Sequence, residues 1–258
     1  DVLDCQIACC AKSTASRGRC CPALRSVGQI RGTCEQRILR CIVNGNIELR
    51  ESSAAMLEGN RVRASYGRAG IELIGTADCE INGNTIEDHP GTGVFAHRNA
   101  RAKLRNNHIL RSGAAGIEVA TGANIIIEGN TVHDGSRVGI LVQEGGTAEC
   151  VQNNVRRNGS SAIEVCGAAS HAVIRSNAIC DGASGVGLLC WHNASASVVD
   201  NDISGYALAG IEIGDGSAPV VKGNRIRHCG QVGILLVPGA NGEVCANVIE
   251  DSQIAGIE

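Results

Sequence analysis

The chain has 258 residues, of which 43% are apolar and 19% are charged, a composition typical of a folded domain rather than a disordered segment. Its formal net charge of −3 lacks the basic excess that nucleic-acid binding requires, and no run of 18 apolar residues is present, so we expect neither a nucleic-acid partner nor a membrane span. Aromatic residues make up only 2% of the chain, which disfavours a sugar-binding cleft lined with stacking rings.

Residues 1–41 are rich in cysteine. The region holds no histidine and no pair of Cys-x-x-Cys motifs, which disfavours a zinc site and leaves disulfides or core packing as the alternatives. We interpret residues 1–41 as degenerate coils, or a cap, of the repeat that follows, and we expect no metal and no other cofactor. Of the 14 cysteines, seven lie here: Cys5, Cys9, Cys10, Cys20, Cys21, Cys34 and Cys41.

Residues 42–258 carry a repeat of about 23 residues. One phrase, an Asn between apolar residues, recurs with spacings of 24, 23, 23, 24, 23, 24, 23 and 23, although Asn153 can replace Asn154 in this series. A second phrase, Gly-Ile-x-Val, follows each Asn after about nine residues, from Gly70 to Gly256, with Ala162 in place of the glycine in one coil. The recurring asparagines are Asn60, Asn84, Asn107, Asn130, Asn154, Asn177, Asn201, Asn224 and Asn247.

The repeat predicts an all-β solenoid. Apolar residues alternate with Glu in Gly70-Ile71-Glu72-Leu73, which indicates a strand with Glu on its outer side, and no helix-length segment fits between the phrases. Units this short must stack to bury their apolar faces, so we predict a single-stranded right-handed parallel β-helix. The asparagines should then form a hydrogen-bonded ladder, and the glycine of each Gly-Ile-x-Val phrase should serve a turn. The last Gly-Ile-x-Val phrase includes Ile257, and a solenoid needs a capped end, so further coils or a cap are expected after it.

The outward residue of each Gly-Ile-x-Val phrase follows a longer period of two coils. From Glu72 on, Glu alternates with an apolar residue along this column, which keeps the like charges two strand spacings apart; only Glu48, one coil before Glu72, breaks the rule. We interpret the column as a candidate partner-binding surface, together with nearby Trp191, because tryptophan is enriched at binding hot spots. A plain solvated sheet face is the alternative. The column consists of Glu72, Phe95, Glu118, Leu141, Glu164, Leu189, Glu212 and Leu235.

The seven histidines fall at different offsets from the Asn series, which predicts that they do not form one cluster. Two pairs, Asp88-His89 and His133-Asp134, occupy the same turn two coils apart and have the residue types for acid–base work or metal binding. Ordinary turn polarity is the alternative for both. We assign no catalytic residue from the sequence.

The paired coils resemble a known class of β-helix. The pattern is carried by Ala-Gly-Ile-Glu-Ile at 209–213 with the strand and Asn at 217–226, followed by Gln-Val-Gly-Ile-Leu-Leu at 231–236. It is similar to the β-helix domain of F-box-only proteins, the substrate receptors of cullin–RING ubiquitin ligases. The resemblance implies a non-catalytic recognition solenoid with a protein substrate or adaptor as partner, in the cytoplasm or nucleus.

Two other functions stay open. The repeat also resembles, more loosely, the β-helices of periplasmic copper-maturation proteins and of polysaccharide epimerases and lyases, which implies a carbohydrate-active enzyme acting on uronates, with a polysaccharide as partner. Against catalysis, all coils are 23–25 residues long, so no insertion builds the walls of a deep cleft. The third alternative is a structural or surface protein, which would be secreted if the cysteines are oxidised.

Overall fold

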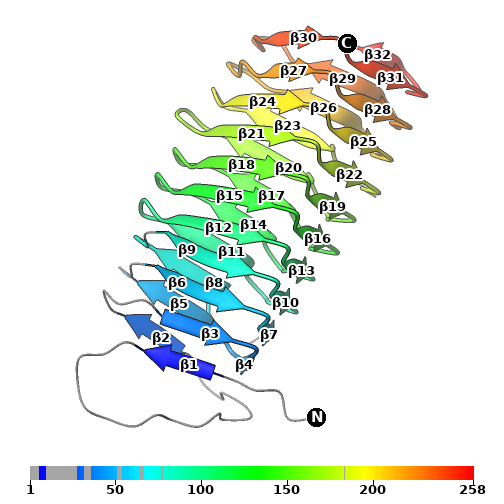
Figure 1. The fold of residues 1–258 in the computed structure, drawn as a ribbon. Helices are drawn as coiled ribbons and strands as arrows, with labels where there is room; N and C mark the ends of the chain where they lie inside the picture. The colour runs from blue at the N-terminus through cyan, green and yellow to red at the C-terminus, as the bar shows by residue number, and fades with distance from the viewer. Residues whose placement is uncertain are drawn as a thin grey trace.

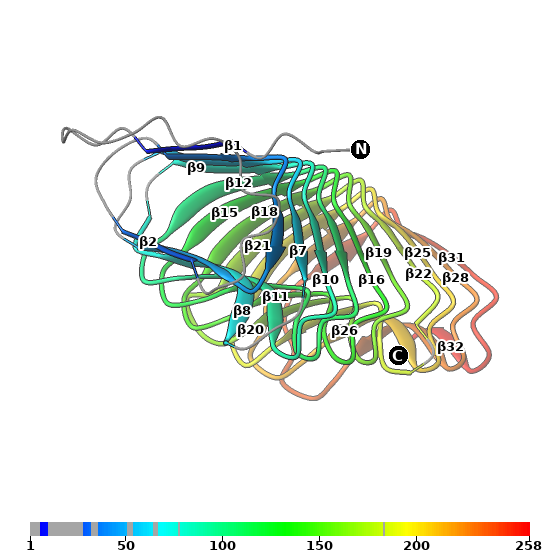
Figure 2. The ribbon, with the colours of Figure 1, turned by 90° about the horizontal axis from the view of Figure 1, so that it is seen from below.

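The structure is a computed structural model that describes residues 6–9, 28–31, 36–50, 54–63, 67–76, 78–182 and 184–258. All elements in this part of the chain are β-strands, β1 to β32, and each coil contributes one strand to each of three sheets (Figure 1). Viewed from below, the coils lie over one another and the sheets form the sides of a tube (Figure 2). Among the described residues there is no helix with the length and apolar character to cross a membrane.

The sheets are named A, B and C here, in the order in which a coil visits them. Sheet A contains β1 (Gln6–Cys9), β3 (Gln36–Leu39), β6 (Ala55–Glu58), β9 (Cys79–Asn82), β12 (Arg101–Arg105), β15 (Asn124–Glu128), β18 (Thr147–Val151), β21 (His171–Arg175), β24 (Ser195–Val199), β27 (Val220–Lys222) and β30 (Glu243–Cys245). Sheet B contains β4 (Ile42–Asn44), β7 (Arg61–Arg63), β10 (Thr85–Glu87), β13 (His108–Leu110), β16 (Thr131–His133), β19 (Asn154–Arg156), β22 (Ala178–Cys180), β25 (Asp202–Ser204), β28 (Arg225–Arg227) and β31 (Val248–Glu250). Sheet C contains β2 (Gly28–Arg31), β5 (Ile47–Arg50), β8 (Ala69–Ile74), β11 (Thr92–His97), β14 (Ile117–Val119), β17 (Ile140–Val142), β20 (Ile163–Cys166), β23 (Leu188–Trp191), β26 (Ala209–Ile213), β29 (Val232–Leu236) and β32 (Ala255–Ile257).

Neighbouring coils pair in parallel and in register, which confirms the predicted β-helix. In sheet B, Ile86 lies beside Ile109, and Ile109 beside Val132. The middle residue of each sheet B strand points inward, because side chains alternate across a strand. The resulting inner columns of Ile, Val and Leu form one continuous core along the axis.

The N-terminal region departs from regular stacking. Strand β1 pairs with β3 in antiparallel direction, so residues 6–9 do not continue the parallel coils, whereas β2 and β3 join them in parallel. Cys41 is disulfide-bonded. Cys5, Cys10, Cys20, Cys21 and Cys34 lie outside the described residues.

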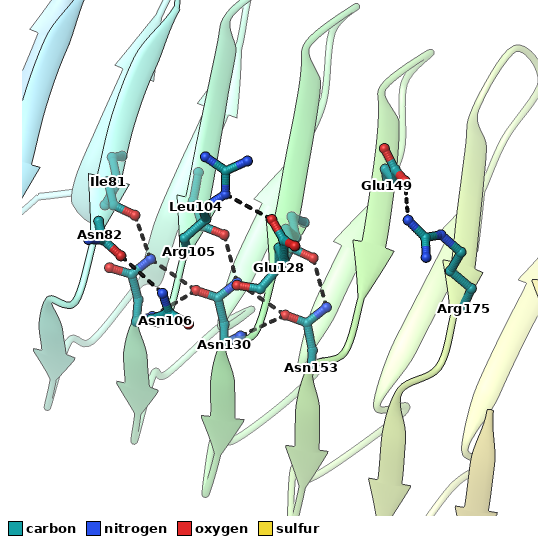
Figure 3. A network of polar contacts seen from close by, with 12 residues as sticks. Ile81, Asn82, Leu104, Arg105, Asn106, Glu128, Asn130, Glu149, Asn153 and Arg175 are labelled. Atoms are coloured by element: carbon teal, nitrogen blue, oxygen red, sulfur yellow. Dashed lines mark hydrogen bonds and ion pairs between the residues drawn. The ribbon is translucent and has the colours of Figure 1, made fainter. Parts of the chain in front are cut away.

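A ladder of buried asparagines lines the bend between sheets A and B. Each Nδ2 donates to the Oδ1 of the asparagine in the next coil, at 2.9–3.1 Å, and the backbone N–H of the same residue donates to that same Oδ1. Each Nδ2 also donates to a strand carbonyl of the preceding coil, as Asn130 does to Leu104 at 2.8 Å (Figure 3). The ladder therefore satisfies the polar groups of a bend that would otherwise be buried without partners.

One rung differs from the predicted series. Asn153, and not Asn154, stacks between Asn130 and Asn177. The sheet register decides between these adjacent residues, because Thr131 pairs with Asn154 and so leaves Asn153 beside Asn130. Asn154 opens β19 and is half-buried.

The glycines of the Gly-Ile-x-Val phrases do not serve a turn, contrary to expectation. Gly70, Gly93 and Gly116 are absent from the residues of positive φ. Instead, a Cβ built on each of them would lie 2.5–2.9 Å from the carbonyl oxygen of the equivalent residue in the next coil. Glycine is used at these three positions because the neighbouring coil approaches too closely for a side chain, whereas Asn46 and Ala162 occupy the equivalent position in two other coils.

We expect Gly116→Ala to destabilise the fold by about 1–3 kcal/mol, the usual cost of overpacking. The added methyl carbon would lie 2.4 Å from Val132 Cγ1 and 2.7 Å from the Gly139 carbonyl oxygen. Gly256→Ala is the matched control, since its methyl would find its nearest atom at 3.9 Å. Urea unfolding monitored by circular dichroism measures both, and equal midpoints for the two variants would contradict the close-approach explanation.

Candidate functional site

The candidate partner-binding column lies on the outer side of sheet C, but its first part is buried. Glu72 is 9% exposed and Phe95 only 2%, and the later members are half-buried. The Arg68 guanidinium lies 4.1 Å from the centre of the Phe95 ring, and the His97 ring stacks on that ring at 4.4 Å. The strand pairing places the column in continuous register as Glu72, Phe95, Glu118, Leu141, Glu164, Leu189, Glu212 and Leu235.

Three of the four carboxylates of this column are bound by the protein's own side chains. The Glu72 carboxylate contacts His97 Nε2 at 3.0 Å. Gln143 donates to Glu118 at 2.9 Å, and Trp191 Nε1 donates to Glu164 at 3.0 Å. Each of these donors lies in the coil that follows its glutamate. Within that coil, the donor comes two residues after the apolar residue that belongs to the column. The column therefore cross-links coils, which favours a structural role over an open binding surface for these three acids.

A second group of side chains gathers on the outer side of sheet B. His108 on β13 and His133 on β16 face one another with their Nε2 atoms 2.6 Å apart. The Nδ1 of His133 lies 2.5 Å from Asp134 Oδ2. The three residues thus form a hydrogen-bonded chain from Asp134 through His133 to His108. The offsets in the sequence predict that the seven histidines do not form one cluster, and they do not identify this pair.

The Asp134 end of the chain is fixed as a carboxylate. Arg157 donates to Asp134 Oδ1 at 2.7 Å, and this bond, reinforced by His133, holds the pKa of Asp134 well below its ordinary value. An ionised carboxylate is an acceptor only, so it receives the Nδ1–H of His133. In the tautomer whose Nε2 carries no proton, His133 Nε2 accepts the Nε2–H of His108.

These hydrogen bonds leave the lone pair of His108 on its Nδ1. His108 is exposed, whereas the His133 side chain is only 8% exposed. Desolvation, together with the charges of His133 and Arg156, lowers the pKa of His108. His108 is therefore neutral at neutral pH and presents a proton acceptor at the surface, supported from behind by a buried histidine and a carboxylate.

Arginines surround this group, and one of them lacks an acidic partner. Arg111 binds Asp88 at 2.5 Å and Glu87 at 3.0 Å. Arg156, which pairs with His133 across the strands, makes no ion pair with any described residue, and its buried Nε has no hydrogen-bond partner there. A half-buried, uncompensated guanidinium beside a basic histidine is suited to an anionic ligand such as a carboxylate.

The other pair singled out from the sequence does not act together. Asp88 binds Arg111 at the surface, whereas His89 is buried and its Nδ1 accepts the backbone N–H of Gly91 at 3.0 Å. Among the described residues, no group of three or more His, Cys, Asp or Glu side chains is arranged to hold a metal ion.

Comparison with known proteins bears on both fold and function. The family described as "Right handed beta helix region" matches residues 29–179, and the family described as "Periplasmic copper-binding protein (NosD)" matches residues 116–258, each more than half of the chain. None of the curated proteins matches the sequence significantly.

Solved structures of alginate epimerases share the fold. A point mutant of the periplasmic alginate epimerase AlgG superposes with a TM-score of 0.62 at 11% identity, over 83% of this chain and 78% of that one. A double mutant of AlgG gives 0.63 at 12% identity, over 88% and 76%. The A-module of the mannuronan C-5 epimerase AlgE4 from Azotobacter vinelandii gives 0.61 at 15% identity, over 86% of this chain and 61% of that module.

These findings correct the function inferred from the sequence. The interpretation as the substrate-binding β-helix of an F-box receptor is wrong, because the matching family is that of a periplasmic protein and the similar structures are alginate epimerases. Neither an F-box nor a ubiquitin-ligase relationship is found. The paired-coil pattern identifies a β-helix but does not distinguish among the functions that β-helices have.

Proposed function

Because this chain belongs to the family of right-handed β-helix regions and, over residues 116–258, to that of NosD, we propose that it is a carbohydrate-active protein that transfers protons on the uronic acid units of an anionic polysaccharide. The observation that carries the proposal is the chain of hydrogen bonds from Asp134 through His133 to exposed His108. Copper is not part of the proposal, because no group of three or more His, Cys, Asp or Glu side chains among the described residues is arranged to hold a metal ion.

The hydrogen-bonded chain is suited to removing a proton from carbon. His108 Nδ1 takes the proton next to the uronate carboxylate, and the electron pair of the broken C–H bond passes into that carboxylate. As Nδ1 gains its proton, the Nε2–H of His108 is free to move to His133 Nε2. The positive charge then rests beside the Asp134 carboxylate, which stabilises it.

Arg156 supplies the charge that such a reaction needs. The carboxylate of the sugar gains a second negative charge as the carbon loses its proton, so a cation beside it lowers the barrier. Arg156 neighbours His133 in the sheet and lacks an acidic partner among the described residues. If a second proton donor, such as water, then protonates the opposite face of the carbon, the sugar is epimerised, and the proton taken by His108 passes to solvent. If the bond to the next sugar breaks instead, the result is an elimination.

The proposal is tested by following deuterium uptake at C5 of polymannuronate, alginate and polygalacturonate in deuterium oxide by NMR, with ultraviolet absorbance to detect elimination. We expect the wild-type chain to exchange the C5 proton, and His108→Gln to reduce the rate by about a hundredfold or more. His171→Gln is the matched control, because His171 is also exposed on a strand but bonds Ser195 on sheet A. No exchange on any of the three polymers, or equal rates in the two variants, would overturn the proposal.

A further inference from the structure

The turn after sheet B carries its own two-coil repeat. From Asp88 to Asp181, its first residue is alternately an aspartate and an arginine, and each of these arginines pairs with the aspartate of the preceding coil. Arg111 binds Asp88 at 2.5 Å and Arg157 binds Asp134 at 2.7 Å, all four with φ between 48° and 56°. The next aspartate is Asp181, and the position where the repeat would place its arginine is occupied by Gly205.

A hollow opens where this arginine is missing. It has a volume of about 460 Å³ and lies against Gly182 and Gly205, on the same edge of the solenoid as Asp134. This volume falls within the range of roughly 300–1,000 Å³ that is typical of small-molecule sites. Its walls also include Tyr206, His228, Asp251 and Gln253.

The walls present hydrogen-bonding groups. Tyr206 packs over Gly182, where an added Cβ would lie 2.1 Å from its ring, and the residue is 2% exposed. Its hydroxyl makes no hydrogen bond within the described part of the chain, and burial raises its pKa, so it remains a donor. His228 Nδ1 lies 3.3 Å from Asp251 Oδ2, so the Nε2 of His228 and the other carboxylate oxygen of Asp251 add two acceptors.

We propose that this hollow is a distal subsite that holds one sugar unit of a uronic acid polymer, which runs along the solenoid from the His108–His133 site. The inference rests on the proposed function. His133 and His228 lie in β16 and in the turn after β28 on one sheet, and the four strand spacings between them amount to about 19 Å (Figure 1). Sugar hydroxyls match the uncommitted donor and acceptors, and a polymer spans the distance whereas a single sugar does not.

The sharpest test restores the missing arginine. Gly205→Arg should fold well, because Arg111 and Arg157 adopt nearly the same backbone conformation at the equivalent position, and the new side chain would reach Asp181 and fill the hollow. Tyr206→Phe is the second variant, which removes only the hydroxyl. Binding of mannuronate and galacturonate oligomers of increasing length is measured by calorimetry.

We expect the affinity of the wild-type chain to rise once the oligomer is long enough to reach the hollow. Gly205→Arg should remove this gain, an effect of about tenfold, and Tyr206→Phe part of it, with binding of short oligomers unchanged. Affinity that does not rise with length, or long oligomers bound equally by Gly205→Arg and wild type, would overturn the subsite. Calorimetry measures binding and not turnover. The subsite can therefore be supported or contradicted even if the chain does not exchange the C5 proton.

Discussion

Replacing Asn153 by alanine should destabilise the protein by about 3–5 kcal/mol, the cost of leaving several buried polar groups without partners. The Asn153 side chain accepts bonds from the backbone N–H and the Nδ2 of Asn130, at 2.9 and 3.1 Å. It donates to the Ile127 carbonyl at 2.8 Å and to Asn177 Oδ1 at 3.0 Å. Alanine offers none of these groups, and water does not reach a residue that is 1% exposed.

The neighbouring residue provides the control for this prediction. Asn154 has the same chemistry but stands in β19, half-buried and outside the ladder, so Asn154→Ala should cost less than about 1 kcal/mol. Urea unfolding followed by circular dichroism compares the two variants at matched protein concentration. If Asn154→Ala proves the more damaging, the ladder passes through the other asparagine and the register of β19 is wrong.

Asp134→Asn should reduce the rate of C5 proton exchange by about a thousandfold, with little loss of fold. Asp134 is a positioning residue that acts through His133: its carboxylate fixes the Nδ1–H of His133 and stabilises the charge that arrives during proton transfer. The asparagine keeps the shape of the side chain but not the charge, and its amide can present a donor where His133 needs an acceptor. Asp181→Asn is the matched control, an aspartate at the same turn position two coils further on.

The pH dependence separates this role from a structural one. Because surrounding groups lower the pKa of His108 from 6.5, the acidic limb of the rate profile should have its midpoint below pH 6.5 in the wild type. In Asp134→Asn, the two histidines lose a neighbouring negative charge, so the limb should move to still lower pH. A variant that lost activity only through misfolding would show a reduced rate with an unchanged midpoint.

Stability should depend on Asp134 in the acid range. Its pKa is held below the ordinary value of 3.8 in the folded state by Arg157 and His133, so the carboxylate favours folding at every pH above that value. This contribution is lost as the pH falls below 3.8 and the group is protonated. Thermal unfolding of Asp134→Asn should accordingly lose part of the acid sensitivity that the wild type shows.

The fold could be predicted from the sequence because stacking in register requires similar residue types at equivalent positions of successive coils. A rung such as Asn130 must be an amide that both donates and accepts, and Gly116 has no room for a side chain. The two residue types therefore recur at one spacing, with Asn46 and Ala162 as the exceptions in the glycine column. Where two adjacent residues meet the demand equally, as at Asn153 and Asn154, only the sheet register distinguishes them. The reason for the glycine was also hidden, because a close approach between coils and a turn both select the same residue.

The candidate site was harder to predict. His133 and Asp134 are adjacent in the sequence, so the pair can be identified from the sequence alone. His108 has a different offset from the Asn series, and the sequence-based prediction of clustering rests on equal offsets alone. In a strand, residues two apart share a face, so a residue at the first position of β13 meets one at the third position of β16 diagonally across the sheet. Two offsets that are both odd or both even place their residues on the same face of the sheet. This comparison, rather than one for equal offsets, would have predicted that the two histidines lie on one face.

The alternation of charges along this solenoid has a consequence for how its length can change in evolution. From Glu72 to Leu235, Glu alternates with apolar residues on sheet C, although Glu48 and Glu72 pair directly in the coils before. From Asp88 to Asp181, Asp alternates with Arg in the turn after sheet B, so within these coils both patterns close only after two coils. Duplicating or deleting a single coil would place two acids, or two bases, on adjacent strands. A duplicated pair inserts without any such clash. We therefore expect natural length variants to differ by even numbers of coils, with the pair as the heritable module.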